Sequence, residues 1–369
     1  MYLLTELIFS LPFAAYAYLR VMALLERTVP RLLFTAGFAA LLAGYPVAET
    51  LSHRGASGWT KDVMIAGYDL LPLFLYLVMT VILSDLLIAA ARGLKLLSRE
   101  AVRGPRFRRA RLVVALVLPV LVVVAGIANY RHIRVREYTV EVPRRSASLD
   151  GLTIAFAADL HLGTITAGDF MDRFIDKVNA AAPDIVLIGG DILEGHGQGE
   201  DAVEYEAEFH RLHPKYGVYA APGNHEGHGS RGSDFFERAG IRMLEDEVVR
   251  IDDVVRLAGR KDAHTRDRLS IVDLLKDVPG ELPLILLDHR PTDLDNIARA
   301  GVDIQLSGHT HHGQLFPVNW LTAREYELSW GHKVKGQTQV FVTSGVQTWG
   351  PPVRTAGYSE ILLIHVRFK

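Results

Sequence analysis

Hydrophobic positions are concentrated in the first third of this 369-residue chain, before residue 131. Four apolar stretches lie there, at about residues 3–25, 32–51, 70–91 and 112–130. Each has the roughly 20 residues that a helix needs to cross a bilayer. Four such runs within 130 residues would leave too little polar surface for a water-soluble domain. The pattern therefore predicts an N-terminal all-α transmembrane region of four helices over residues 1–130, with the membrane lipid bilayer as its partner.

The pattern changes after residue 130. Charged and apolar positions alternate in residues 131–148, which predicts a linker strand that leaves the membrane. Pro143 marks the end of this strand. From residue 149 to residue 369, short apolar runs alternate with stretches of helical periodicity. One such stretch, 169–182, places Phe170, Phe174 and Val178 at helical spacing. This alternation predicts a layered α/β domain over residues 149–369.

Five short apolar runs of this second domain lead directly into polar motifs. They are residues 152–158 before Asp159-Leu160-His161, 185–188 before Gly189-Gly190-Asp191, 217–220 before Gly223-Asn224-His225, 284–287 before Asp288-His289, and 302–306 before Gly308-His309-Thr310-His311. Ligands of layered α/β domains gather at the carboxyl ends of the strands. The motifs therefore predict one cluster, made of Asp159, His161, Asp191, Asn224, His289, His309 and His311.

The cluster has the composition of a metal site. Seven oxygen and nitrogen ligands are too many for one ion, but they fit two divalent ions about 4 Å apart with one carboxylate bridging them. The chain has no cysteine, which excludes thiolate ligands and a cysteine nucleophile. Ligands without sulfur suit Mn²⁺, Fe or Mg²⁺, with Zn²⁺ also acceptable, and we favour Mn²⁺. An isolated His-x-His would more often be a pair of solvated histidines, but the fivefold recurrence opposes that interpretation.

Charge is divided unevenly between the two regions. Residues 1–130 carry 13 Lys and Arg against 7 Asp and Glu, whereas the rest of the chain carries 27 against 35. An acidic second domain argues against nucleic-acid binding, which requires cationic surface to neutralise phosphates. In the first region, eight basic residues separate the third and fourth apolar runs: Arg92, Lys95, Arg99, Arg103, Arg106, Arg108, Arg109 and Arg111.

Lys and Arg are enriched in cytoplasmic loops. The loop from 92 to 111 is therefore predicted to be cytoplasmic. The chain would be a multi-pass protein of the cell (inner or plasma) membrane, with its second domain extracytoplasmic. Five arginines that follow the last run oppose this orientation: Arg131, Arg134, Arg136, Arg144 and Arg145.

Arg20 and Asp85 are charged residues that lie within the apolar runs. Charges inside a membrane are costly, and they are usually paired or functional. The two side chains could pair, since both fall toward the cytoplasmic ends of their predicted helices. The alternative, which the sequence slightly favours, is that Arg20 extends alone to the membrane interface.

The motifs Asp159-x-His161, Gly190-Asp191, Gly223-Asn224-His225-Glu226, His289-Arg290-Pro291 and Gly308-His309-Thr310-His311 together resemble those of the calcineurin-like metallophosphoesterases. The resemblance covers residues 150–369. It implies a two-sheet αββα sandwich and hydrolysis of phosphoric esters. The whole chain is similar to the membrane-anchored bacterial branch of the family, some members of which act on phospholipids or on nucleotide-linked lipid A precursors.

The resemblance also implies a role for each motif residue. Asp159, His161, Asp191 and His311 would hold the first metal. Asp191 would bridge to the second metal, which Asn224, His289 and His309 would complete. His225 would be catalytic and would stabilise or protonate the leaving oxygen. His312 departs from the pattern, which usually has glycine there, and at a positive φ histidine would cost more than glycine. Asp262 and Arg354 are weaker candidates for the substrate cleft.

The sequence thus predicts a membrane-anchored phosphoesterase that cleaves a phosphodiester or pyrophosphate bond by in-line attack of a metal-bridging hydroxide. A lipid-linked phosphorylated substrate is favoured, because the anchor keeps the site near the bilayer. One alternative is a protein or nucleotide phosphatase of the same fold. A less favoured alternative is a non-catalytic membrane sensor or scaffold, since decayed domains usually lose ligands and every expected ligand is present here.

Overall fold

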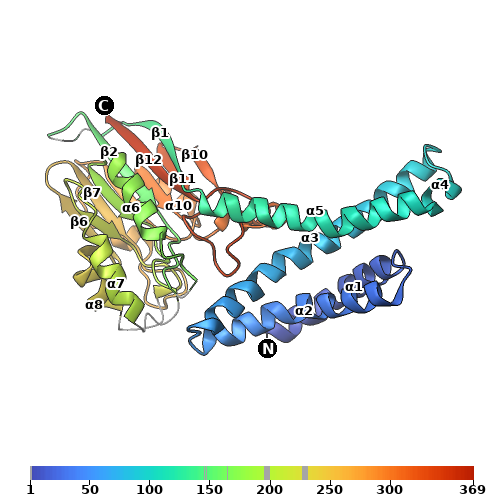
Figure 1. The fold of residues 1–369 in the computed structure, drawn as a ribbon. Helices are drawn as coiled ribbons and strands as arrows, with labels where there is room; N and C mark the ends of the chain where they lie inside the picture. Colours follow the sequence, from blue (N-terminus) through green and yellow to red (C-terminus); the bar gives the residue numbers. More distant parts are fainter. Residues whose placement is uncertain (1, 145, 147, 164, 195–199, 227–231) are drawn as a thin grey trace. The chain divides into compact units, whose positions relative to one another are not determined.

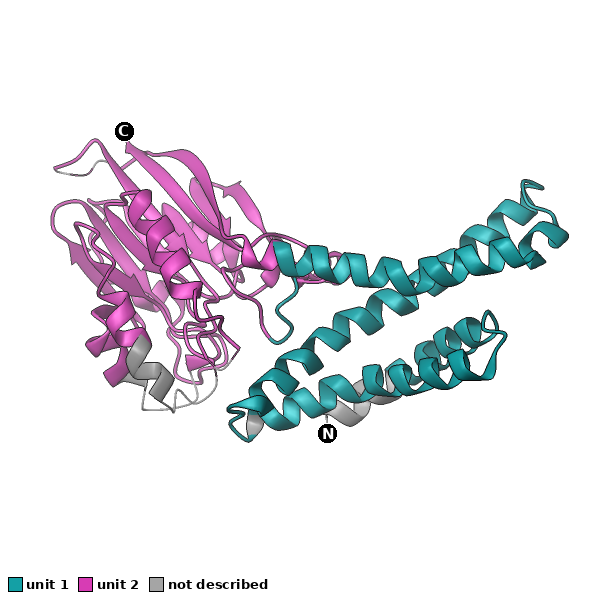
Figure 2. Cartoon of the chain, viewed as in Figure 1, with its two compact units in different colours: residues 1–128, 350–355 teal, residues 129–349, 356–369 magenta. Residues whose placement is uncertain are grey.

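The computed structural model describes all residues except 1, 145, 147, 164, 195–199 and 227–231. The chain forms two compact units, coloured separately in Figure 2. Unit 1 contains residues 1–128 together with the short segment Gly350–Thr355, and unit 2 contains 129–349 and 356–369. The chain therefore returns to unit 1 once, for six residues, near its C-terminal end.

Unit 1 is helical. Its helices are α1 (Tyr2–Met22), α2 (Thr28–His53), α3 (Trp59–Gly93), α4 (Arg99–Arg103) and α5 (Pro105–Arg131). Within the described residues, three helical segments are long and apolar enough to cross a membrane: Thr28–Ser52, Trp59–Gly93 and Pro105–Arg131. Within the described residues the predicted count of four spans is therefore one too high. The first predicted span, 3–25, coincides with a helix, α1, that is not among these three.

Apolar side chains line both the interior and the outside of unit 1. Ala17, Val21, Phe38 and Leu77 are among the residues buried between the helices. Outside, α5 exposes a continuous apolar surface that includes Val117 and Leu121. Helices that face lipid on one side and each other on the other side have this distribution.

Small residues let two of these helices approach closely. A Cβ added to Gly67 of α3 would lie 2.6 Å from the carbonyl oxygen of Gly44 in α2. Such backbone proximity, made possible by small side chains, is typical of membrane helix pairs.

Arg20 and Asp85 are paired, contrary to the alternative that the sequence slightly favours. The Arg20 guanidinium donates to both carboxylate oxygens of Asp85, at 2.5 and 2.6 Å. Arg111 of α5 also pairs with Asp85, and the Tyr16 hydroxyl donates to it at 2.6 Å. One carboxylate therefore accepts hydrogen bonds from α1 and α5 while itself belonging to α3, which compensates for its cost in an apolar environment.

Unit 2 is a sandwich of two sheets, each with six strands in the described residues. The first has the order β1-β12-β2-β3-β4-β5, and its strands are β1 (Arg134–Val142), β2 (Gly151–Ala157), β3 (Ile185–Ile188), β4 (Val218–Ala220), β5 (Ile241–Met243) and β12 (Glu360–Phe368). The second has the order β10-β11-β9-β8-β7-β6, and its strands are β6 (Glu247–Ile251), β7 (Val255–Gly259), β8 (Leu284–Leu287), β9 (Ile304–Ser307), β10 (Gly331–Lys335) and β11 (Thr338–Val342).

Helices cover the outer faces of the two sheets (Figure 1). Their bounds are α6 (Phe170–Ala180), α7 (Glu200–Phe209), α8 (Gly232–Arg238), α9 (Ile271–Leu275) and α10 (Leu294–Arg299). A further helix, α11 (Val318–Glu325), lies beside the short 3-10 turn His311–Gly313. Alternation along β2 explains the layering: Ile154 and Phe156 pack between the sheets, whereas Ala155 and Ala157 face the layer of α6 to α8. Because both faces are covered, the central strands are apolar throughout.

This architecture confirms the predicted αββα sandwich. All five apolar runs that precede the motifs are strands, and the segment 169–182 contains α6. The predicted linker strand, 131–148, contains β1, which pairs in parallel with β12 at the edge of the first sheet. Residues 145 and 147 of that segment lie outside the described part of the chain.

Candidate metal centre

The predicted ligands follow strands of both sheets. In the first sheet β2, β3 and β4 are mutually parallel and lead to Asp159, His161, Asp191 and Asn224. In the second sheet β8 and β9 are parallel and lead to His289, His309 and His311. The site is therefore assembled where the carboxyl ends of the two sheets meet, and not along one sheet edge.

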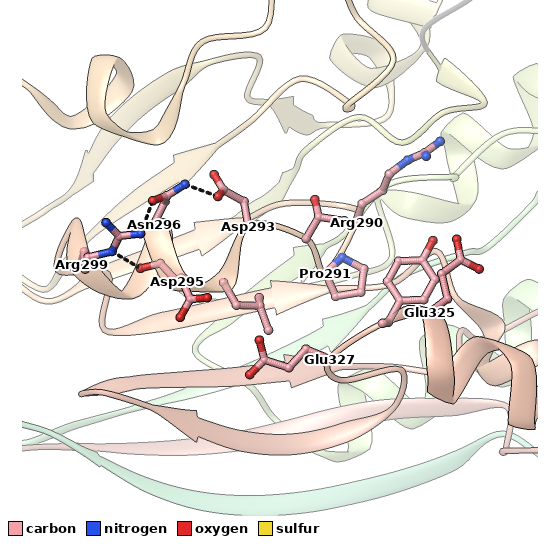
Figure 3. A pocket seen from close by; sticks show the side chains of 11 residues that line it. Arg290, Pro291, Asp293, Asp295, Asn296, Arg299, Glu325 and Glu327 are labelled. Carbon is pink, nitrogen blue, oxygen red and sulfur yellow. Dashed lines mark hydrogen bonds between the residues drawn. The ribbon is translucent and has the colours of Figure 1, made fainter.

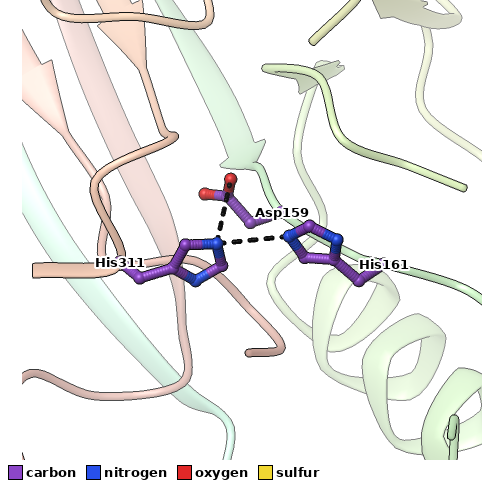
Figure 4. A group of neighbouring side chains, drawn as sticks. All are labelled: Asp159, His161 and His311. Carbon is purple, nitrogen blue, oxygen red and sulfur yellow. Dashed lines mark hydrogen bonds and ion pairs between the residues drawn. The ribbon is translucent and has the colours of Figure 1, made fainter. Parts of the chain in front are cut away.

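Asp159, His161 and His311 form the first group of side chains (Figure 4). The Nε2 atoms of His161 and His311 are 3.2 Å apart, and Asp159 Oδ1 lies 3.7 Å from His311 Nε2. Two imidazoles on one ion, each with a metal–nitrogen bond of about 2.0–2.1 Å, place their nitrogens roughly 3.2 Å apart. The spacing of these atoms thus fits a shared cation.

Asp191, His289 and His309 form a second group, which Asp191 joins to His161 of the first. Asp191 Oδ2 lies 3.1 Å from His289 Nε2 and 3.9 Å from His161 Nε2. The other oxygen, Oδ1, accepts a hydrogen bond from the backbone N–H of His225 at 2.9 Å. A carboxylate oxygen between imidazoles of two groups is the arrangement expected of a bridging ligand.

Two of the imidazoles are held by their outer nitrogens in the orientation that metal binding requires. His289 Nδ1 lies 2.7 Å from the carbonyl oxygen of Gly189, and His161 Nδ1 lies 2.5 Å from Glu194 Oε2. A metal-ligating histidine donates its second N–H to a carbonyl or carboxylate in this way, which leaves Nε2 free for the ion. The donor set and its supports therefore fit two divalent ions.

Asn224 and His225 follow β4 and lie beside these groups. Asn224 Oδ1 accepts a hydrogen bond from Arg290 Nη2 at 3.5 Å. His225 Nε2 lies 4.0 Å from Asp191 Oδ2, and its ring meets that of His161 edge-on at 4.9 Å. These distances place His225 close enough to be either a ligand or a proton donor. The ligand role of Asn224 and the catalytic role of His225 stay predictions.

Five of the seven predicted ligands have a backbone conformation that L-residues rarely adopt. Their φ values are positive: Asp159 57°, His161 42°, Asp191 51°, His309 69° and His311 45°. His312 has φ 46°, as the glycine usual at its position would allow, and its Nδ1 lies 3.1 Å from Ser329 Oγ. Strain of this kind costs of order 1–3 kcal/mol per residue and gathers at functional sites.

Glu226 supports the site, although the sequence analysis gave it no role. Its half-buried carboxylate accepts hydrogen bonds from the backbone N–H groups of Asp191, Ile192, Leu193 and Gly223, at 2.7–3.1 Å. Those bonds fix the turn that carries Asp191 and join it to the loop after β4. The sequence feature that could have indicated this role is the place of Glu226 in the Gly223-Asn224-His225-Glu226 motif. Glu194, which orients His161, offered no comparable signal.

Burial and mutual charge shift the pKa values of the ligands in opposite directions. Burial lowers the pKa of His161, but Glu194 and the nearby aspartates raise it, with a net value of about 9. Burial likewise lowers the pKa of His289, but Asp191 dominates and raises it to about 10. Burial raises the pKa of Asp159 to about 6, whereas burial and the adjacent His289 lower that of His309 to about 3. Without metal, protons therefore occupy part of the site.

Comparison with known proteins agrees with this geometry. A family model described as calcineurin-like phosphoesterase matches residues 152–313. A metallophosphoesterase of Aquifex aeolicus is 31% identical over 248 residues, which cover 64% of this chain and 93% of that protein. The chain belongs to the calcineurin-like metallophosphoesterase family. The resemblance to this family noted from the motifs is thereby confirmed, whereas the membership of its bacterial branch stays a prediction.

Two further relatives are matched over a smaller share of their own length. A "transmembrane protein with metallophosphoesterase domain" of Danio rerio is 31% identical, over 72% of this chain and 66% of that protein. A metallophosphoesterase of Helicobacter pylori (strain J99) is 32% identical, over 58% of this chain and 60% of that protein. The matched part thus spans less than two thirds of either relative.

The Glu226 contacts lead to a prediction about metal affinity. In Glu226→Gln, the amide would direct N–H donors at backbone N–H groups that now share a carboxylate. We expect metal affinity to fall about 10- to 100-fold, as it does when other supports of metal ligands are lost. Calorimetric titration of the metal-free protein with Mn²⁺ measures this. The exposed Glu245 provides the control, and equal affinity of Glu226→Gln and Glu245→Gln would contradict the supporting role.

The raised histidine pKa values predict pH-dependent metal binding. Ligating imidazole must be neutral, and His161 and His289 are protonated at pH 7 in the metal-free protein because their pKa values exceed 7. Mn²⁺ binding at pH 7 should therefore release protons, and affinity should rise with pH up to about 9–10. Titrations in buffers of different ionisation enthalpy count the protons. Glu194→Gln, which removes one cause of the raised pKa of His161, should release fewer, and an unchanged count would contradict this explanation.

Proposed function

We propose that this chain is a membrane-anchored, two-metal phosphoesterase that hydrolyses a phosphodiester or pyrophosphate bond. The observation that supports it best is the position of Asp191 Oδ2 between His289 Nε2 and His161 Nε2. One carboxylate common to two sets of imidazoles is the arrangement used for in-line displacement at phosphorus.

Two divalent cations bound by these ligands would lower the pKa of a shared water, giving hydroxide near neutral pH, and would neutralise charge on the phosphoryl oxygens. The protein's own residues orient the reaction. His225 would face the leaving oxygen and give it a proton as the phosphorus–oxygen bond breaks. Its Nδ1 lies 3.5 Å from Glu194 Oε1, so the carboxylate that orients His161 also orients the proton donor.

A lipid-linked substrate is the finer part of the proposal. Only two residues separate the end of α5, at Arg131, from the start of β1, at Arg134. A domain joined to apolar helices by so short a connection favours a substrate that stays in the bilayer.

The alternatives make different demands on the site. A protein or nucleotide phosphatase would use the same ligands on a soluble substrate. A sensor or scaffold would not need a complete ligand set, yet every predicted carboxylate and imidazole ligand lies in one of the two groups. The second alternative is therefore less favoured than the first.

Hydrolysis of bis-p-nitrophenyl phosphate by the detergent-purified protein tests the proposed chemistry. We expect turnover that requires Mn²⁺ and is abolished by chelator and by Asp191→Asn. His225→Ala should lower kcat by about 10²- to 10⁴-fold with metal retained, as expected for loss of a general acid. Asp277→Asn, at an exposed position, is the matched control. Absence of both turnover and bound metal would favour the scaffold.

Orientation in the membrane can be tested because the chain lacks cysteine. We propose an extracytoplasmic unit 2 in the cell membrane, on the basis of the basic loop at 92–111. Ser146→Cys should then react with an impermeant thiol reagent in intact cells, whereas Arg103→Cys should react only after lysis. Labelling of Arg103→Cys and protection of Ser146→Cys would reverse the topology.

A further inference from the structure

Arg290 lies beside the second group of ligands and has no part in the chemistry described so far. It directly follows His289 and lines a cavity of about 640 Å³ with residues 291–296, Arg299 and residues 325–327. Figure 3 shows its side chain extending away from Asp293, Asn296 and Arg299, which line another part of the same cavity. The guanidinium instead lies by Asn224, whose Oδ1 is 3.5 Å from Nη2.

Asp262 fixes the direction of this guanidinium. Asp262 is 2% exposed, and its Oδ2 accepts a hydrogen bond from Arg290 Nε at 3.1 Å. The other oxygen, Oδ1, accepts from the backbone N–H of His264 at 2.9 Å, which holds the carboxylate in place. Arg290 Nη2 lies 2.7 Å from His264 Nδ1. A buried carboxylate of this kind makes a guanidinium rigid before any ligand arrives.

The remaining donors of Arg290 have no acceptor within the described part of the chain. Nε and Nη2 make its hydrogen bonds there, and Nη1 makes none. The side chain is 15% exposed, so a ligand can still reach these donors. A guanidinium next to a site for two divalent cations would be repelled by them, and Asp262 offsets this repulsion only from the side of Nε. A phosphoryl group is the anion that both would share.

We propose that Arg290 binds a non-reacting phosphoryl oxygen of the substrate through Nη1, and that Asp262 positions it. The inference rests on the proposed function, because it assumes a phosphoryl group at the two-metal site. Planar guanidinium groups present parallel N–H donors that match phosphate oxygens, which a lysine ammonium does not reproduce. Arg290 would thus align the phosphorus atom for attack and would act equally on lipid-linked and soluble phosphodiesters.

Binding of inorganic phosphate to the Mn²⁺-loaded, full-length protein in detergent tests the inference independently of turnover. Calorimetry should show affinity lowered about 10- to 100-fold in Arg290→Met, the loss expected for hydrogen bonds to a charged group. KM for bis-p-nitrophenyl phosphate should rise as well. Arg290→Lys, which keeps the charge, should recover only part of the affinity. Arg299→Met is the control, because Arg299 donates to Asn296 and to the Asp295 carbonyl.

The outcomes separate the inference from the proposed function. Wild-type affinity for phosphate in Arg290→Met, with two metals bound, would overturn the role of Arg290 while leaving the phosphoesterase intact. Loss of bound metal in Arg290→Met would also overturn it, since Arg290 would then support Asn224 and not the substrate. If Arg290→Met does not fold, Arg290→Lys provides the test. Wild-type phosphate affinity of Arg290→Lys would exclude recognition of phosphate by the planar guanidinium.

Asp262→Asn tests the positioning role through a double-mutant cycle. If Asp262 acts only by holding Arg290, it should weaken phosphate binding in the wild-type background and have no further effect in Arg290→Met. Additive losses in the double variant would show that Asp262 acts on phosphate or metal by another route, and would overturn its assignment.

Discussion

Asp191 lies where the carboxyl ends of the two sheets meet, and its carboxylate is almost completely buried. Burial alone would raise its pKa, but the adjacent His289 and His161 lower it well below its usual range. A buried charge is tolerated when partners of opposite charge and well-placed donors surround it. Here the partners come from both sheets, since His161 follows β2 and His289 follows β8. The attraction that keeps Asp191 ionised therefore also joins the two halves of the sandwich.

The backbone around this charge carries strain that only the surrounding fold can maintain. Asp159, His161, Asp191, His309 and His311 all have positive φ. The loops that carry these residues pack closely against each other. A Cβ added at Gly308 would lie 2.5 Å from the Cβ of Ala158. Glu226 adds acceptors for the backbone N–H groups of the strained turn. Binding of cations would offset part of the energetic cost of this backbone strain. Metal binding would therefore favour the ordered conformation of these loops.

The sequence was sufficient for much of this architecture because apolar runs and polar motifs alternate so regularly. The strands that precede Asp159, Asp191, His289 and His309 were each predicted within one or two residues of their observed bounds. Division of those strands between two sheets could not be read from periodicity, because strands buried on both faces are apolar throughout. Glu194 was missed because its role depends on contact with His161, 33 positions away.

In the membrane region, too, the sequence could not predict contacts between residues that lie far apart along the chain. Length and hydropathy located the helices, yet they could not decide whether Arg20 was paired, because the partner depended on packing. Arg111, counted in the sequence only as a loop charge, contributes to the same cluster around Asp85. Charge counts along a chain therefore do not reveal its internal contacts.

The return of Gly350–Thr355 to unit 1 affects how the protein could be divided into fragments. A Cβ at Gly126 of α5 would lie 2.6 Å from Cγ1 of Val353, which is completely buried. The backbone N–H of Arg354 donates to the Gly126 carbonyl at 3.1 Å. A soluble fragment cut before residue 149 would therefore lose more than an anchor. It would lose the edge strand β1 and leave the segment Gly350–Thr355 without the helix against which it packs.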